Sequence, residues 1–194
     1  MGLPGRYLPC TTGSLQCELI MAEVSNSKLL NIDTGILNVQ DACIVLVKTE
    51  WNAAIVDELE KGCLQELQKY GVKKIMTITV PGCFEISFAI KSYFENSIKL
   101  AGLSQGKRPD AFIALGTVIR GDTPHFDYVC KAVTDGVVQL NLQLPVPVIF
   151  GVLTVDNEQQ ARDRIGGKHG HKGEEAAITA LKMIALVKSF NSIK

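Results

Sequence analysis

The stretch Ala111–Asp127, AFIALGTVIRGDTPHFD, decides the fold of this chain. Its first five residues, AFIAL, form an apolar run of the length expected for a buried strand of a parallel sheet. Gly116 and Gly121 then predict a loop in which the backbone turns sharply or approaches a ligand closely. Thr123 is expected to cap a following helix, with Pro124 at its first position. The stretch therefore predicts a strand, a glycine-bearing loop and the start of a helix.

His125 falls in the first turn of that predicted helix. Unpaired backbone N–H groups and the positive end of the helix dipole gather there, so the loop can receive an anion. The same dipole disfavours a positively charged imidazole, and we expect a neutral ring that can take up a proton. The alternative is a histidine that packs at the helix start with its ring hydrogen-bonded. The glycine-bearing loop favours the first interpretation, with His125 as a catalytic residue.

Strands and helices alternate on both sides of this stretch. Further strands are predicted at 43–47, 73–80 and 147–153, and helices at 52–71, 84–94, 124–140, 157–164 and 174–189. This alternation predicts one α/β domain with a four-stranded parallel sheet and helices on both faces. Phe88 and Phe126 are expected to face inward from their helices. Residues 1–40 are predicted to be a partly flexible extension with one short strand near 29–37, and 41–194 the domain.

The ligand of such a sheet binds beyond the carboxyl ends of its strands. Trp51 lies at the end of the first strand, where its indole could stack on a flat ring or serve only as a core or interface residue. Glu85 follows Pro81-Gly82 and could accept hydrogen bonds from hydroxyl groups or simply favour a helix dipole. Arg164 and Lys172 are candidates for binding an anion, although surface cations are usually only solvated.

The totals exclude several classes of protein. With 46% hydrophobic and 21% charged residues, the chain has the composition of a globular domain. Twenty basic residues balance twenty acidic ones, which gives no sign of a nucleic-acid or membrane-surface partner. No apolar run reaches the roughly 18–20 residues of a membrane span. Six cysteines without a C-x-x-C pair and the lack of an apolar signal core predict a cytoplasmic protein.

Two further motifs give weaker indications of function. His169 and His171 flank Gly170 in the segment IGGKHGHKG, which we expect to be a solvated loop. No third ligand accompanies the two histidines, so no metal site is predicted. The tripeptide Arg120-Gly121-Asp122 matches a cell-adhesion signal, but the chain shows no secretion signal that would support that role.

Four segments resemble the lumazine synthase family: VPGCFEI (80–86), ALGTVIRGDTPHFDYVC (114–130), VPVIFGVLT (146–154) and EQQARDRIGGKHGHKGEEAAITALKMIAL (158–186). The resemblance implies a flavodoxin-like, three-layer sandwich. It implies the condensation of 5-amino-6-ribitylamino-uracil with 3,4-dihydroxy-2-butanone 4-phosphate to 6,7-dimethyl-8-ribityllumazine, the penultimate step of riboflavin biosynthesis, without a cofactor or metal.

The resemblance also implies a set of site residues. His125 would transfer protons, and Trp51 would stack on the pyrimidine ring. The backbone of Asp122 and Thr123, together with Arg164, would bind the phosphate group, with Lys172 nearby. The remaining implied contacts to substrate are made by Cys83, Phe84, Glu85, Thr117, Val118 and Ile119, and by Phe150 of an adjacent subunit.

Family members assemble as pentamers with sites between subunits, and in many cases pentamers form an icosahedral shell. The short segment IGGKHGHKG favours the shell. Three other functions are alternatives: an archaeal-type riboflavin synthase, a non-catalytic flavin- or lumazine-binding carrier or shell protein, and an unassigned phosphate-binding α/β domain.

Overall fold

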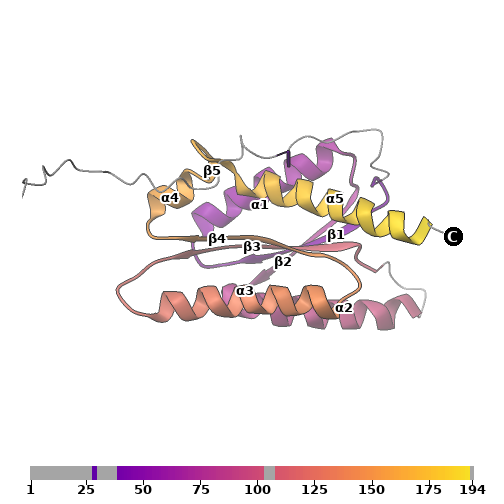
Figure 1. The fold of residues 1–194 in the computed structure, drawn as a ribbon, viewed down its shortest axis with the longest axis horizontal. Coiled ribbons are helices and arrows are strands. Elements are labelled where there is room, and N and C mark those ends of the chain that lie inside the picture. The colour runs from indigo at the N-terminus through magenta and orange to yellow at the C-terminus, as the bar shows by residue number, and fades with distance from the viewer. Residues whose placement is uncertain (1–27, 30–38, 103–107, 193–194) are drawn as a thin grey trace, which may run out of the picture.

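A four-stranded parallel sheet forms the centre of the described chain (Figure 1). The computed structural model describes residues 28–29, 39–102 and 108–192. The strands are β1 (Cys43–Thr49), β2 (Lys74–Val80), β3 (Ala111–Ile119) and β4 (Val148–Val155). They lie in the order β2-β1-β3-β4, with every neighbouring pair parallel. This arrangement confirms the predicted α/β class and is that of a flavodoxin-like fold.

Helices cover both faces of the sheet. Figure 1 shows α1 (Ala53–Lys69) and α5 (Lys172–Ser192) on one face, and α2 (Ile86–Gly102) and α3 (His125–Gln143) on the other. A short 3-10 helix, η2 (Cys83–Glu85), leads from β2 into α2. None of the helices that the structure describes is long and apolar enough to cross a membrane.

Alternate residues of each strand supply two hydrophobic cores. On β3, Ile113 and Leu115 pack under α1 and α5, whereas Phe112 and Ala114 pack under α2 and α3. All four are fully buried. Each large aliphatic or aromatic side chain buried in this way contributes about 1.5–3 kcal/mol relative to an exposed one. Burial on both faces therefore explains the continuous apolar run in this strand.

The boundaries at the deciding stretch differ from those predicted. β3 continues to Ile119, so Gly116 lies inside the strand and not in a loop. The helix α3 begins at His125 with Pro124 in the capping position, and no side chain caps it. Thr123 is therefore not the cap. The pairing of β3 with β4 extends the strand, because residues up to Ile119 face partners on β4.

Two aromatic side chains do not face the core as predicted. Phe88 is 77% exposed, since the inward stripe of α2 runs through Ile86, Ile90 and Phe94. Phe88 lies about 200° around the helix from Ile86 and so points outward. Phe126 is half-buried, with its ring under the guanidinium of Arg120.

The segment after β4 folds into more structure than a loop. A short helix α4 (Glu158–Arg162) precedes an antiparallel hairpin of β5 (Ile165–Gly167) and β6 (Gly170–His171). His171 is half-buried against α1, where a Cβ added to Gly62 would lie 2.7 Å from its Nδ1. The same nitrogen accepts a hydrogen bond from the Gly173 N–H at 3.2 Å. Gly166, Gly167 and Lys168 are exposed, so the prediction of a solvated segment holds for them but not for His171, which packs on α1.

The described residues of the extension contact the domain, and Val39 is buried in the core under α1 and α5. Lys182 of α5 donates hydrogen bonds to the backbone oxygens of Lys28 and Leu29. The rest of the predicted short strand at 29–37 lies outside the described residues.

Candidate active site

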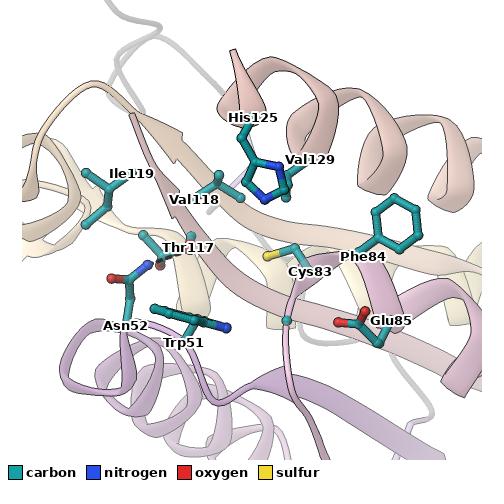
Figure 2. A pocket seen from close by; sticks show the side chains of 11 residues that line it. Trp51, Asn52, Cys83, Phe84, Glu85, Thr117, Val118, Ile119, His125 and Val129 are labelled. Atoms are coloured by element: carbon teal, nitrogen blue, oxygen red, sulfur yellow. Dashed lines mark hydrogen bonds between the residues drawn. The ribbon is translucent and has the colours of Figure 1, made fainter. Parts of the chain in front are cut away.

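A cavity of about 580 Å³ opens at the carboxyl ends of β1, β2 and β3. Figure 2 shows His125 on one side of it and Trp51 on the other, with Cys83 between them. Seven predicted site residues besides His125 line it: Trp51, Cys83, Phe84, Glu85, Thr117, Val118 and Ile119. The remaining lining residues are Asn52, Gly82 and Val129.

Trp51 follows the end of β1 and presents an open aromatic face. Its side chain is 73% exposed, although its backbone N–H is held by the Pro81 oxygen at 3.3 Å. A core role for this tryptophan is therefore excluded within the described chain. An indole exposed to this extent beside a cavity is suited to cover a flat ring or a neighbouring surface.

Asn52 contributes to the site in a way that the sequence analysis missed. It has φ of 59° and ψ of 40°, the left-handed conformation, and its side chain does not cap α1. Instead, its Nδ2 donates a hydrogen bond to the backbone oxygen of Thr117 at 2.9 Å. Asparagine adopts the left-handed conformation more readily than most residues, so its presence here could have predicted the turn. The contact ties the β1–α1 turn to β3 across the cavity floor.

His125 is the first residue of α3 and its side chain is exposed. Within the described residues, no group forms a hydrogen bond to the imidazole, so the alternative of a ring held at the helix start does not apply. Val129 lies one turn further along α3 and lines the same cavity. Its spacing of four residues from His125 could have identified it. The imidazole is thus free to contact a bound molecule.

Glu85 ends η2 and is exposed beside the cavity. Its carboxylate caps no helix in the described chain, because the turn at Gly82 has no side-chain cap. Phe84 is 66% exposed on the same short helix. The pair therefore offers an acceptor and an apolar ring to the cavity, and Glu85 also lies in the first turn of η2, so a ligand contact and the helix-dipole role are compatible.

Cys83 is buried beneath the cavity, where it meets β3. A Cβ at Gly116 would come within 2.7 Å of the Cys83 sulfur, so glycine makes room for this side chain. Burial raises the pKa of Cys83 to about 12, although hydrogen bonds from Thr117 and Thr49 oppose the shift. The thiol stays protonated near neutral pH and is not a nucleophile. The Thr117 hydroxyl beside it is buried without a hydrogen-bond partner in the described chain.

Five predicted site residues do not line the cavity of this chain. Asp122 and Thr123 are exposed in the turn before α3. Phe150 is half-buried in the middle of β4, opposite Ala114, and not at a strand end. The other two, Arg164 and Lys172, lie beside the β5–β6 hairpin.

Arg164 and Lys172 share one carboxylate. The Nη2 of Arg164 lies 2.8 and 3.0 Å from the two oxygens of Glu175, and the Lys172 Nζ lies 3.3 Å from one of them. The side chains of Arg164 and Glu175 are only 12% and 8% exposed. Arg164 also donates from Nη1 to the His169 oxygen. The two cations form a second polar centre, separate from the cavity within one chain.

The described residues contain no group of three or more histidine, cysteine, aspartate or glutamate side chains that could hold a metal ion. The polar side chains that line the cavity include the Glu85 carboxylate, the His125 imidazole and the Asn52 amide.

A flavodoxin-like sheet whose strand ends form a cavity lined by aromatic, carboxylate and imidazole groups is typical of one class of protein, the α/β enzymes that act on small molecules. A sequence model of the 6,7-dimethyl-8-ribityllumazine synthase family matches residues 41–188. The chain is 48% identical to the Parabacteroides distasonis 6,7-dimethyl-8-ribityllumazine synthase over 143 residues, which is 73% of this chain and 83% of the relative. It is 49% identical to the Bacteroides fragilis enzyme of that name over 148 residues, 75% of this chain and 96% of the relative. The chain belongs to the lumazine synthase family.

Proposed function

We propose that this chain condenses 5-amino-6-ribitylamino-uracil with 3,4-dihydroxy-2-butanone 4-phosphate, releasing 6,7-dimethyl-8-ribityllumazine, phosphate and water. The observation that carries this proposal is the gathering of Trp51, Glu85 and His125 around one cavity in a member of the lumazine synthase family. The flat pyrimidine fits beneath the exposed indole. The hydroxyl-rich ribityl chain fits beside the free carboxylate of Glu85.

The reaction needs positioned groups more than a strong nucleophile. A ring amine of the pyrimidine attacks the ketone, a Schiff base forms, phosphate leaves, and the second amine closes the ring with loss of water. Each step moves a proton, and His125 stands where it can accept or return one. A positioned imidazole contributes about 10²–10⁴-fold to rate. Holding the two substrates together supplies much of the rest. No step transfers electrons to an outside acceptor, so we propose no cofactor.

The lining of the cavity supplies the remaining contacts to the pyrimidine substrate. Cys83 and Phe84 lie on one side of the cavity, and the β3 residues Thr117, Val118 and Ile119 form its floor. Cys83 contributes through its backbone and packing, because its thiol stays protonated.

The phosphate group would be bound by backbone groups of Asp122 and Thr123 at the start of α3. Arg164 and Lys172 would supply the positive charge. In one chain these two cations pair with Glu175 outside the cavity. We therefore propose that Arg164, Lys172 and Phe150 reach the cavity of a neighbouring copy, and that the working site lies between chains.

A homo-oligomer accounts for the exposed aromatic side chains on three helices. Phe84, Phe88 and Tyr128 on η2, α2 and α3 are 66%, 77% and 71% exposed. Large aromatic side chains exposed to this extent favour contact with another chain. We propose a pentamer in the cytoplasm, with assembly of pentamers into an icosahedral shell, and a domain that begins at about residue 41, where the family match also begins.

Formation of the lumazine chromophore tests the proposed function. Purified chain incubated with both substrates should produce 6,7-dimethyl-8-ribityllumazine, followed by absorbance. His125→Ala should slow turnover without abolishing it. Riboflavin formed from lumazine alone would instead indicate a riboflavin synthase. Lumazine binding without turnover would indicate a carrier; the relatives' names favour neither alternative.

A further inference from the structure

Arg120 occupies the junction between the sheet and the start of α3. Its backbone N–H donates to the Val155 oxygen at 2.9 Å and so continues the pairing of β3 with β4. Its Nε donates to Asp156 at 2.9 Å, just after β4, and its Nη1 donates to Asp127 at 3.2 Å, in the first turn of α3. Its Cζ lies 4.0 Å from the centroid of the Phe126 ring, within the range of a cation–π contact.

The side-chain contacts of Arg120 involve residues on either side of His125 in the sequence. Phe126 and Asp127 directly follow His125, and the turn 120–124 directly precedes it. One guanidinium therefore connects the ends of β3 and β4 to the first turn of α3. In Figure 1 the loops that follow β3 and β4 leave the sheet at the same end. Arg120 itself is not among the residues that line the cavity, so it does not meet the proposed pyrimidine site directly.

We propose that Arg120 is a positioning residue, which holds the turn 120–124 and His125 in the geometry that binds the phosphate ester. This proposal rests on the proposed function. The planar fork of arginine suits the role, because it bonds to two separate carboxylates while its face covers an aromatic ring. Lysine offers a point charge and cannot make all three contacts at once.

Charge provides a second reason for arginine at this position. Asp127 and Asp156 stand beside the turn that would receive a phosphate group, and Arg120 is the cation paired with both. If the guanidinium were removed, both carboxylates would repel the incoming phosphate. A loss of Arg120 should therefore weaken binding of the phosphate ester more than binding of the uncharged pyrimidine.

Because Arg120 is exposed, its positioning role can be distinguished from a contribution to the stability of the fold. The side chain is 45% exposed, and exposed ion pairs usually contribute little to the free energy of unfolding. We therefore expect Arg120→Gln to alter kinetics while the unfolding transition stays close to that of the wild type.

The test compares Arg120→Gln, Arg120→Lys and Arg120→Gln/Asp156→Asn, with KM measured for each substrate in turn. Arg162→Gln is the control, since Arg162 also pairs with a carboxylate and is 55% exposed. For Arg120→Gln we expect KM of the phosphate ester to rise about tenfold, equivalent to about 1.4 kcal/mol, with KM of the pyrimidine nearly unchanged. Arg120→Lys and the double variant should each recover part of the loss, and the control should match the wild type.

Inorganic phosphate supplies a readout that does not depend on turnover. Calorimetric titration of the whole protein should show about tenfold weaker phosphate binding for Arg120→Gln. If the wild type forms no lumazine, the proposed function fails, yet the phosphate titration still tests Arg120. Equal effects on both KM values, unchanged phosphate binding, or a large loss of stability in Arg120→Gln would each overturn the positioning role.

Discussion

The ion pair between Arg164 and Glu175 yields a quantitative prediction for Glu175→Ala. The carboxylate accepts two hydrogen bonds from Arg164 and one from Lys172. Removing this carboxylate leaves the Arg164 guanidinium, which is only 12% exposed, without a counter-charge and next to the Lys172 cation. Breaking a buried pair from one side costs about 3–5 kcal/mol. Arg164 keeps its bond to the His169 oxygen, so we expect the lower end, about 3 kcal/mol.

The chain offers a matched control for this change. Glu158 pairs with Arg162 in the same chemistry, but the two side chains are 59% and 55% exposed. Glu158→Ala should cost less than about 1 kcal/mol. The double variant Arg164→Ala/Glu175→Ala should be more stable than Glu175→Ala alone, because no unpaired charge is left buried.

Equilibrium unfolding in urea, followed by circular dichroism, measures these differences. Urea is preferred because guanidinium salts screen ion pairs. All variants should be compared at one protein concentration, since assembly makes apparent stability depend on concentration. A loss for Glu175→Ala no larger than that for Glu158→Ala, or a double variant less stable than Glu175→Ala, would refute the reasoning.

Three shorter predictions concern packing, binding and pH. Gly173→Ala should destabilise by about 3 kcal/mol in urea unfolding, because its Cβ would overlap the Leu59 oxygen and lie 2.9 Å from the Leu59 carbonyl carbon, whereas Gly121→Ala, in open space, should not. Trp51→Ala should raise KM of the pyrimidine about tenfold, since one stacked base contributes about 1–3 kcal/mol, and Trp51→Phe should restore most of it. Because folding raises the pKa of Cys83 from 9.0 to about 12, the folded form keeps a proton that the unfolded form loses. The free energy of unfolding should fall across that pH range, and less steeply in Cys83→Ala.

Local patterns predicted the layers of this fold. The apolar run at 111–115 was identified as a buried strand because a central parallel strand is covered on both faces. The helix predicted at 124–140 forms, and it buries Val133, Val137 and Leu140 at helical spacing. The apolar runs also located the ends of the strands. Because the carboxyl ends of parallel strands lie at one edge of the sheet, the convergence of Trp51, Glu85 and His125 there followed from topology alone.

Features that depend on contacts between distant residues could not be predicted. Gly116 was expected in a loop, yet it makes room for Cys83, a neighbour known only from the fold. Asparagine is a common residue before a helix, but the side chain of Asn52 donates to the Thr117 oxygen and its backbone is left-handed. The sharing of Glu175 by two cations likewise depends on how the β5–β6 hairpin packs. Short-range patterns carry no information on such partners.

Complementation between two defective chains tests most directly whether the site is shared between neighbours. One chain carries Trp51→Ala/His125→Ala and the other Arg164→Ala, and the two are co-expressed and purified together. Each variant alone should form lumazine slowly. Random mixing in a ring should create intact sites at about one quarter of the interfaces, so the mixture should recover about one quarter of wild-type activity. Activity no greater than that of the better variant alone would contradict a site built from two chains.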